Sequence, residues 1–361
     1  MTEPMFQVAV IGGGPAGAVA ARLLATAGMQ VALIERGRKR SFKAGETLPP
    51  VANPVLRRLG LWSLLTEGHM RCPGNRSAFG SEALVDLDFI RSANGAGWHL
   101  DRIKFETALQ KQAIESGVNF HRNALVGLKR EGTVWDIPLA DGSHLTANFV
   151  IDASGGARAV LRRLNVAEAR YDQLAACVGI YQCDVQQDHR TIVEATQDGW
   201  WYSAGLPKGQ RAVMYFSDTD LESYGQVRKS FDVELSKTRF VCREVQRSNA
   251  LGAPDIFVEP AYSAHAAQVA GPGWLALGDA AMRFDPLSSQ GLWTSFLGAE
   301  KAVSAILDGS ESTLRGYAGW CTETFRSYLS ERSKYYEMEL RWPHLEFWQR
   351  RRLTSQLRRP A

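Results

Sequence analysis

The spacing of apolar residues over the first 35 positions predicts a strand, a tight turn, a helix and a second strand. Residues 8–11 (VAVI) form a short apolar run of the kind found in strands that are buried on both faces. From Val19 to Ala27, apolar side chains recur at helical spacing, and Gly28 ends the predicted helix. Residues 31–34 (VALI) form the second apolar run. This order predicts a β-α-β unit.

The rest of the chain divides into helix-like runs and short strands. Helices are predicted over residues 51–65, 101–117, 231–242, 286–309 and 313–341. Strands are predicted over residues 118–120, 124–128, 149–152, 178–185, 192–195, 200–204, 212–216 and 274–277, with a hairpin turn at 141–142.

The order of these segments predicts an α/β chain with one sheet inserted into another domain. Alternating strands occupy about residues 166–267, and the pattern of the first domain resumes at residues 273–281 (GWLALGDAA). The expected parts are a discontinuous cofactor domain (1–72, 98–165 and 268–310), a substrate domain (73–97 and 166–267) and a C-terminal helical segment (311–361).

Three glycines with the spacing G-x-G-x-x-G follow the first strand directly. Gly12 permits the sharp turn, Gly14 lets the backbone approach a pyrophosphate, and Gly17 lets the helix lie close to the strand. The N-terminus of the helix supplies N–H groups and a dipole that attract an anion. Glu35 ends the second strand and offers a carboxylate to a ribose hydroxyl. These elements together predict a site for a dinucleotide whose ribose carries no phosphate.

Composition and charge exclude several classes of protein. The chain has 361 residues, 45% hydrophobic and 22% charged, and a net charge of +4, which are ordinary values for a globular protein. No basic helix alternates with aromatic residues, so no nucleic-acid partner is expected, and the arginines at 350–352 and 358–359 are interpreted as a solvated end. No cluster has metal-ligand spacing, so no metal is expected.

Cysteine usage and hydropathy predict a soluble, cytoplasmic protein. The five cysteines are scattered and odd in number, which favours reduced thiols over a disulfide framework. The first strand begins by about residue 6, which leaves no room for a signal peptide. No apolar run approaches the length of a membrane span.

Three motifs give the chain a family resemblance that covers nearly its whole length. They are GGGPAG at 12–17, the helix entry Leu100-Asp101-Arg102, and LGDAAMRFDPLSSQG at 277–291. With these motifs the chain resembles FAD-dependent monooxygenases of the glutathione-reductase-like fold. The resemblance implies a Rossmann FAD-binding domain, an inserted and mostly antiparallel substrate sheet, and C-terminal helices.

The resemblance also implies how the chain binds FAD. Asp279 is expected at the ribityl and pyrophosphate end of the cofactor, although an aspartate at this place is also a plausible helix N-cap. Residues 286–292 are expected to start a helix beside the flavin ring, where N–H groups stabilise negative charge. Arg102 is expected to contact FAD, with a surface ion pair as the alternative. The expected FAD-binding residues are Gly12, Gly14, Pro15, Ala16, Gly17, Glu35, Arg36, Glu46, Arg102, Val126, Gly278, Asp279, Pro286, Gly291 and Leu292.

A narrower resemblance points to the flavin-dependent halogenase superfamily. GETLPP at 45–50, GWWYSAGLP at 199–207 and YYEMELRWPHLEFWQRR at 335–351 are similar to motifs of that superfamily. Within it, the chain most resembles the maturation flavoproteins of lysine ε-oxidase, glycine oxidase and quinohemoprotein amine dehydrogenase, which are implicated in oxygenating a tryptophan of a partner protein.

Two departures argue against halogenation. Halogenases carry a lysine shortly before the first inserted strand, and Cys72 stands there in this chain, with no lysine between Lys43 and Lys104. Arginine does not substitute for that lysine, because it does not deprotonate readily to a haloamine. The halogenase GWxWxIP motif is also altered, with Tyr202 and two extra residues before Pro207.

The source of electrons and the reactive groups are only partly indicated. Single-component hydroxylases engage NAD(P)H through an Asp-Gly pair, and this chain has IDASGGAR at 151–158, so a separate flavin reductase is expected, with direct use of NAD(P)H as the alternative. Hydroxylation through a flavin C4a-hydroperoxide needs a dry site that holds an aromatic ring. The candidate pocket residues are Trp200, Trp201, Tyr202, Ser289 and Gln290, with core packing as the alternative for the tryptophans. His69 and His99 are candidate bases, and the alternative is that they are ordinary exposed histidines in loops.

The sequence therefore predicts an FAD-dependent monooxygenase that hydroxylates an indole-like or phenolic centre. The substrate is either a free small molecule or part of a client protein or peptide. The rivals are a halogenase that uses another lysine, a reductase or dehydrogenase similar to geranylgeranyl reductases, and a maturation factor that binds a client through the aromatic residues Tyr335, Trp342, Phe347 and Trp348.

Overall fold

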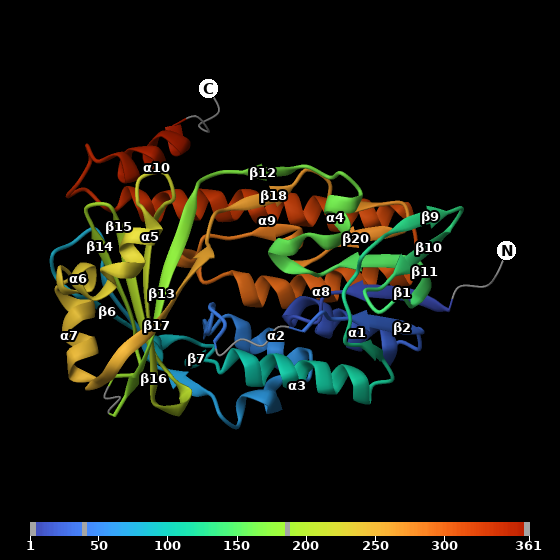
Figure 1. Ribbon diagram of the computed structural model, residues 1–361, viewed down its shortest axis with the longest axis horizontal. Helices are drawn as coiled ribbons and strands as arrows, with labels where there is room; N and C mark the ends of the chain where they lie inside the picture. The colour runs from blue at the N-terminus through green and yellow to red at the C-terminus, as the bar shows by residue number, and fades with distance from the viewer. Residues whose placement is uncertain (1–4, 38–41, 185–187, 357–361) are drawn as a thin grey trace.

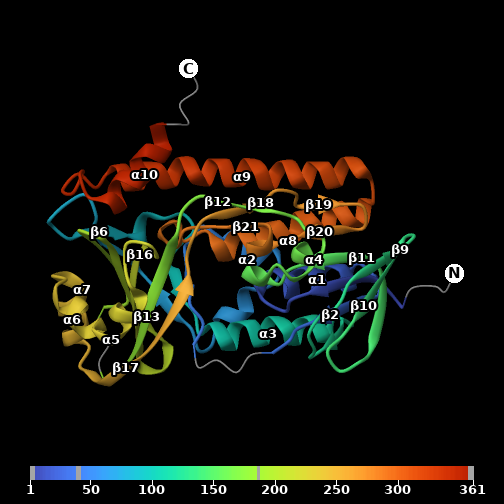
Figure 2. The same ribbon diagram turned by 45° about the horizontal axis from the view of Figure 1, so that its top comes forward.

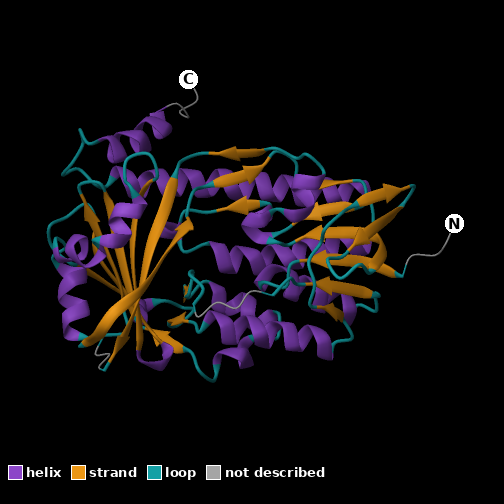
Figure 3. Cartoon of the chain, viewed as in Figure 1, coloured by secondary structure: helices purple, strands orange, loops and turns teal. Residues whose placement is uncertain are grey.

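Two large sheets lie at opposite ends of the molecule, and a long helix spans the distance between them (Figures 1 and 3). The computed structural model describes residues 5–37, 42–184 and 188–356. The long helix α9 (Glu311–Glu337) runs over both sheets, as the view in Figure 2 also shows. Its 27 residues correspond to about 40 Å.

The first sheet has the strand order β19-β20-β11-β1-β2-β8, and its central pairs are parallel. Val8, Val10 and Val150 have no exposed surface, as expected for strands covered on both faces. Two further strands extend β11 as an antiparallel meander. The bounds are β1 Phe6–Ile11, β2 Val31–Ile34, β8 Asn119–His121, β9 Lys129–Glu131, β10 Val134–Pro138, β11 His144–Asp152, β19 Ala270–Gly271 and β20 Trp274–Ala276.

Helices α1 and α8 pack against one another on this sheet (Figure 1). The buried face of α1 is built mainly from alanine and glycine, which lets its backbone lie close to its neighbours. In α8, a Cβ atom at Gly298 would lie only 3.1 Å from the Leu277 side chain, so this helix lies close to the turn after β20. The helices of this part are α1 Pro15–Thr26, α2 Ala52–Arg58, α3 Arg102–Glu115, α4 Ala159–Arg163 and α8 Gly291–Asp308.

The second sheet has seven strands in the order β17-β13-β16-β15-β14-β5-β6 and is antiparallel except for the pair β5–β14. Helices α5 (Tyr224–Lys229), α6 (Phe231–Ser236) and α7 (Phe240–Arg247) cover its outer face. The strands are β5 Gly74–Ala78, β6 Val85–Asp88, β13 Leu174–Cys183, β14 Thr191–Thr196, β15 Gly199–Leu206, β16 Gln210–Asp218 and β17 Ala250–Pro260.

Two small three-stranded sheets lie between the large ones. One consists of β3 (Thr47–Leu48), β7 (Gly97–His99) and β4 (Met70–Cys72). The other consists of β12 Glu168–Arg170, β18 Ala264–Ala266 and β21 Met282–Arg283. Polar side chains of the first small sheet lie against the inner face of the seven-stranded sheet.

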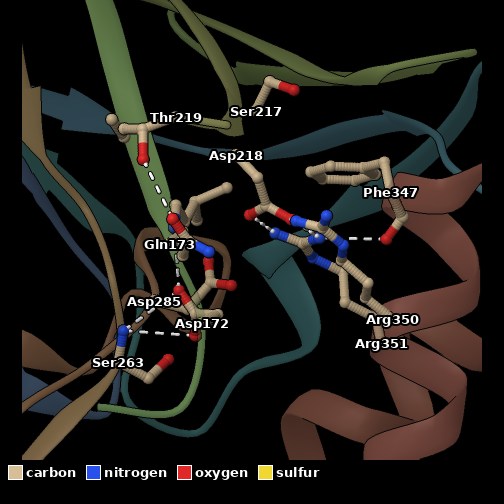
Figure 4. A network of polar contacts seen from close by, with 12 residues as sticks. Asp172, Gln173, Ser217, Asp218, Thr219, Ser263, Asp285, Phe347, Arg350 and Arg351 are labelled. Carbon is tan, nitrogen blue, oxygen red and sulfur yellow. Dashed lines mark hydrogen bonds and ion pairs between the residues drawn. The ribbon is translucent and has the colours of Figure 1, made fainter. Parts of the chain in front are cut away.

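The C-terminal helices complete the core of the seven-stranded sheet. In α10 (Glu346–Gln356), Trp348 is fully buried and donates from Nε1 to the carbonyls of Thr196 and Gln197. Arg351 is buried and pairs through both terminal nitrogens with Asp218 of β16, at 3.1 and 2.8 Å (Figure 4). Trp348 and Arg351 of α10 therefore serve the fold.

A buried ion-pair cluster fixes α9 to the loops of both sheets. The Arg332 guanidinium lies 2.8 Å from a carboxylate oxygen of Asp172 and 3.1 Å from one of Asp285. The Tyr336 hydroxyl donates to Asp285 at 2.8 Å, and the Trp200 indole N–H donates to the Tyr336 oxygen at 3.1 Å. Each of these side chains is almost completely buried. The cluster links the helix, β15 and the segment that precedes α8.

Several sequence predictions need correction. Residues 51–65 form α2 and a separate 3-10 turn (Trp62–Leu65), because Gly60 has φ +67° and interrupts the helix. Residues 231–242 likewise divide into α6 and the start of α7. Residues 124–128 hold only one isolated bridge, at Leu125. The sequence also missed β17, whose prolines and glycine hide its strand character.

Among the described residues, none of the helices combines the length and the apolar character needed to span a bilayer. The same part of the chain contains no group of histidine, cysteine or carboxylate side chains that is placed to hold a metal ion.

Candidate functional site

Three neighbouring parallel strands of the first sheet end at one edge, and each is followed by a turn. β1 leads into Gly12, β11 ends at Asp152, and β20 leads into Gly278. The Ala153 N–H donates to the Ile11 carbonyl, and the Leu277 N–H donates to the Asp152 carbonyl, so the three turns are held in line. The carboxyl edge of a parallel sheet is the usual location of a ligand site in such folds.

The first turn is closed on one side and open on the other. A Cβ atom at Gly12, which has φ +110°, would lie 2.3 Å from the Ala153 carbonyl oxygen, and one at Gly17 would lie 1.9 Å from the Gly12 carbonyl oxygen. At Gly14 a Cβ atom would meet nothing within 4 Å. Pro15 and Ala16 then begin α1. The packed glycines fix the turn, and Gly14 leaves the space beside the helix N-terminus free.

The two motifs that are far apart in the sequence lie side by side. A Cβ atom at Gly278 would be 3.0 Å from the Ala16 Cβ atom, so the second glycine-acid turn touches the start of α1. Asp279 follows within the same short 3-10 turn, and its side chain is exposed. One ligand is therefore able to touch both motifs.

Glu35 lies beside the first turn, as the spacing predicted. Its carboxylate accepts from the Gly13 N–H at 2.6 Å and from the Gly37 N–H at 3.1 Å, and a carboxylate retains acceptor capacity for a ribose hydroxyl. Arg36 is exposed next to it. Val126 is also exposed, but its N–H donates to the Pro138 carbonyl, which leaves its own carbonyl for a ligand.

Helix α8 begins near this region after a constrained turn. The Asp285 carboxylate accepts from the Leu287 N–H, Pro286 is exposed, and Ser289 adopts φ +50°, a left-handed conformation that non-glycine residues seldom take. A Cβ atom at Gly291 would meet nothing within 4 Å. Gln290 is half-buried and Leu292 is buried. The start of α8 therefore presents backbone N–H groups to open space, which suits a negatively charged ligand atom.

Arg102 holds the segment that leads into β3. Its guanidinium donates to the carbonyls of Ala44 and Gly45 and to the Glu106 carboxylate. The residue is only 9% exposed, so the alternative of a surface ion pair is wrong. Arg102 thereby positions Glu46, which is 1% exposed and has a carboxylate oxygen, Oε2, without a hydrogen-bond partner among the described residues.

The candidates on β15 divide between the two faces of the sheet. Trp200 stacks on Phe216 with ring centroids 3.8 Å apart and faces inward, and Tyr202 lies on the same inner face. Trp201 faces outward, against Tyr215 and Phe231 beneath the outer helices. Adjacent strand residues point to opposite faces, so the prediction that Trp201 and Tyr202 share a pocket is wrong.

A line of polar side chains connects Glu46 to the small sheet of β3, β7 and β4. The Tyr202 hydroxyl lies 2.5 Å from Glu46 Oε1 and 2.5 Å from Thr47 Oγ1, and Thr47 Oγ1 lies 3.1 Å from His99 Nδ1. His99 Nε2 lies 3.0 Å from the His189 carbonyl oxygen. Thr47 was not expected from the sequence, because nothing marks a lone threonine as a site residue.

Burial shifts the pKa values of Glu46, Tyr202 and His99. It raises the pKa of Glu46, against the opposing effects of the Tyr202 hydroxyl and the Arg102 charge, and it raises the pKa of Tyr202. It lowers the pKa of His99 to about 4. His99 is fully buried, so its interpretation as an exposed loop histidine is wrong. His69 is half-buried, and its Nδ1 accepts from the Asp101 N–H.

Cys72 occupies a dry position close to this line. Its side chain is fully buried, and its thiol donates to the Gly74 carbonyl at 3.2 Å and lies 3.8 Å from Thr191 Oγ1. Burial raises the pKa of the thiol. Cys72, the residue expected from the sequence to replace the halogenase lysine, is therefore a buried neutral thiol.

The residues at this edge fit FAD. The free space at Gly14 and Gly291 and the N-termini of α1 and α8 offer N–H donors to a pyrophosphate and a flavin ring, and the exposed Asp279 carboxylate is able to accept from a ribityl hydroxyl. A parallel sheet with a dinucleotide-binding turn at its carboxyl edge, joined to an antiparallel sheet, is the architecture expected of an FAD-dependent oxidoreductase.

Comparison with known proteins agrees with this class. The FAD binding domain family model matches residues 5–334. The FAD-dependent oxidoreductase LodB of Marinomonas mediterranea is 28% identical over 367 residues, with 98% of each chain covered. The flavin-dependent halogenase armH3 of Armillaria mellea is 28% identical over 357 residues, which cover 88% of this chain and 68% of that one.

Two solved structures share the fold. The peptidyl tryptophan dihydroxylase QhpG superposes with a TM-score of 0.82 at 23% identity, over 97% of this chain and 79% of that one. The flavin-dependent halogenase CmlS has the same TM-score and identity, over 99% of this chain and 70% of that one.

The chain belongs to the FAD binding domain family and is an FAD-dependent oxidoreductase. The resemblance to the flavin-dependent halogenases and their tryptophylquinone-maturation relatives is confirmed, and so is the α/β fold.

Replacement of Asp279 tests the FAD contacts. We expect Asp279→Ala to weaken FAD binding about 10–100-fold, because loss of a hydrogen bond to a charged group costs about 1.5–3 kcal/mol. The exposed β17 residue Asp255 is a matched control, and Asp255→Ala should leave the affinity unchanged. Fluorescence titration of the FAD-free protein measures both, and equal affinities for the two variants would remove Asp279 from the site.

Proposed function

We propose that this chain is an FAD-dependent monooxygenase that hydroxylates an electron-rich aromatic ring, indole-like or phenolic, held within a peptide or protein. The observation that carries the proposal is the chemistry around Tyr202. Its neighbours are the Glu46 carboxyl, the Thr47 hydroxyl and the Cys72 thiol, and none of them provides an amine. A halogenating site needs such an amine, whereas hydroxylation needs a shielded ring and a place for protons.

The inner face around Tyr202 suits an aromatic substrate. Phe42, Phe257 and Leu287 are half-buried apolar side chains that pack against the same cluster as Tyr202, and the Phe42 and Phe257 rings lie 6.1 Å apart. Such side chains hold a flat ring and exclude water from it. Leu287 lies in the short 3-10 turn (Pro286–Ser288) before α8 and so connects this apolar surface to the cofactor side.

The role of FAD is to supply the oxidising chemistry: reduced flavin and O2 insert one oxygen atom into the ring, and the other leaves as water. The side chains of this protein hold the ring, exclude water and manage protons. The proposed electron donor is a separate flavin reductase, because the chain carries a single dinucleotide fingerprint and Ser154 in place of the acid of the Asp-Gly pair. The Arg283 guanidinium also occupies the space beside Gly156.

A peptide-bound substrate is favoured over a free one by the relatives. One neighbour of the same fold, QhpG, is named a peptidyl tryptophan dihydroxylase, and this chain covers 79% of it. The proposed cellular location is the cytoplasm, where a reductase and an unfolded client are both available.

The proposed activity is tested with the holoenzyme, a flavin reductase, NADH and O2. We expect a tryptophan-containing peptide to gain the mass of one oxygen atom per event, with consumption of O2 and no dependence on halide. The same reaction with free indoles and phenols, with and without bromide, is the comparison. Halogenated product would establish the halogenase alternative, and product formed without O2 uptake would establish a reductase.

A further inference from the structure

Three residues of α9 hold a single aspartate, Asp285, in the turn before α8. Tyr328, Arg332 and Tyr336 lie on one face of the helix, because side chains four positions apart are neighbours on a helix surface. The Asp285 N–H donates to the Tyr328 hydroxyl at 2.7 Å. Asp285 Oδ2 accepts from Arg332 at 3.1 Å and from Tyr336 at 2.8 Å. Asp285 has no exposed surface, and the three residues of α9 are called the clamp below.

The clamp is also anchored to the seven-stranded sheet. The Trp200 indole N–H, from β15, donates to the Tyr336 oxygen at 3.1 Å. The Arg332 guanidinium lies 2.8 Å from Asp172, whose carboxylate accepts from the Leu174 N–H at the start of β13. The turn before α8 is therefore held by the seven-stranded sheet as well as by the sheet that carries the glycine turns.

Local hydrogen bonds join Asp285 rigidly to the start of α8. Asp285 Oδ1 accepts from the Leu287 N–H at 3.0 Å. The Asp285 carbonyl accepts from the Ser288 N–H at 3.1 Å and from the Ser288 hydroxyl at 2.8 Å. Ser289 follows with its left-handed φ of +50°, and α8 begins at Gly291. A displacement of Asp285 therefore displaces the first N–H groups of α8.

The start of α8 is expected to face the part of FAD whose charge changes on reduction. The pyrophosphate is expected at Gly14 and the start of α1, which leaves the start of α8 for the flavin ring. A Cβ atom at Gly291 would meet nothing within 4 Å, so this helix start is open, and the first N–H groups of a helix have no partners within it. Reduction adds electrons to the ring, and N–H groups held in a fixed place stabilise the added negative charge.

We propose that Tyr328 and Tyr336 are positioning residues for FAD, which hold the start of α8 where its N–H groups stabilise the negative charge of reduced FAD. Both tyrosines are almost fully buried, so they act through Asp285 and not by touching the ring. Burial raises the pKa of both hydroxyls, so each keeps its hydrogen at neutral pH. The proposal concerns FAD binding and does not depend on the proposed hydroxylation.

The affinities for the two redox forms of FAD test the proposal. Tyr336→Phe and Tyr328→Phe each remove one hydroxyl and leave the formal charge and the ring unchanged. We expect each variant to weaken the binding of reduced FAD about 10-fold more than that of oxidised FAD, because displaced N–H groups matter most when the ring is negatively charged. Isothermal titration calorimetry of the FAD-free protein measures both affinities, with oxidised FAD in air and with dithionite-reduced FAD under argon.

Tyr317 provides a matched control on the same helix. Its hydroxyl is also buried and donates to the Ala276 carbonyl at 2.7 Å, so Tyr317→Phe removes a comparable hydrogen bond. This bond ends at β20 and not at the turn before α8, so the control should change the affinities for the two redox forms by the same factor. Equal losses for both forms in the clamp variants would show that the tyrosines only stabilise the fold. That result, or unchanged affinity for reduced FAD, would overturn the proposal.

Hydrogen exchange of the FAD-free protein gives a second measurement, which needs neither cofactor nor substrate. We expect the amide hydrogens of residues 287–292 to exchange about 10-fold faster in Tyr336→Phe than in the unaltered protein or in Tyr317→Phe, because the clamp holds this turn. Unchanged exchange would contradict the positioning role. Both measurements stand even when no hydroxylated product forms, so failure of the proposed function and failure of this proposal are distinguishable.

Discussion

Gly17→Ala should abolish stable FAD binding and lower the free energy of unfolding by about 3 kcal/mol or more. An alanine at a helical position normally stabilises by about 0.5–1 kcal/mol relative to glycine. Here the new Cβ atom would lie 1.9 Å from the Gly12 carbonyl oxygen and 2.9 Å from the Ala153 side chain. Because both neighbours belong to buried elements, the clash outweighs the helix preference. To relieve it, α1 must move away from β1, which displaces the turn at Gly12 and Gly14.

The long helix α9 provides a matched control for this variant. Gly319 is also helical, but a Cβ atom there would meet nothing within 4 Å. Gly319→Ala should therefore leave FAD binding unchanged and keep or slightly raise the stability. Urea unfolding and fluorescence titration of both variants measure the difference. Normal FAD affinity in Gly17→Ala would show that the close contact between α1 and β1 is not needed for the site.

Arg332→Met should cost about 3–5 kcal/mol of the free energy of unfolding, which is the usual effect of removing one partner of a buried ion pair. Arg332 lies 2.8 Å from Asp172 and 3.1 Å from Asp285, and all three side chains are almost fully buried. Methionine fills a similar volume, so the loss reflects carboxylates left without their cation. Asp285 responds most, because burial already raises its pKa.

An exposed arginine on the same helix separates the effect of burial from that of charge. Arg326 pairs with Glu323 at 2.8 Å, but its side chain is 71% exposed. Arg326→Met should change the stability by no more than about 0.5 kcal/mol. Urea unfolding measures the loss of stability in both variants. Equal losses would mean that the buried ion pairs stabilise the fold no more than the exposed one. The Arg332 variant should also loosen the start of α8, because Asp285 caps the turn before it.

The cofactor side of the molecule was largely predictable from the sequence. The glycines of the first turn, Glu35 and the second turn at Asp279 are marked by local patterns, because each must satisfy a local backbone or hydrogen-bonding requirement. That these two turns touch was an inference from the family resemblance, and the contact between Gly278 and Ala16 agrees with it.

The inner face of the seven-stranded sheet was not predictable in the same way. Both faces of β15 are covered, so the run at 199–206 is apolar on both sides. The sequence therefore does not reveal whether Trp200 or Trp201 faces inward, because that depends on how β15 is placed in the sheet. The partners of Tyr202 are Glu46 and Thr47, at the start of β3 and about 155 residues earlier in the chain. Contacts of this kind are set by tertiary packing and leave no local signal.

The position of α10 has a consequence for how the protein is made. Trp348 and Arg351 complete the core of the seven-stranded sheet, whose strands come from residues 74–260. In the first sheet, β11 lies between β1 and β20, which are far apart in the sequence. The seven-stranded sheet therefore lacks part of its core until α10 has been made. Until α10 is in place, part of the aromatic inner face of this sheet is uncovered, and exposed apolar surface of this kind promotes aggregation of folding intermediates.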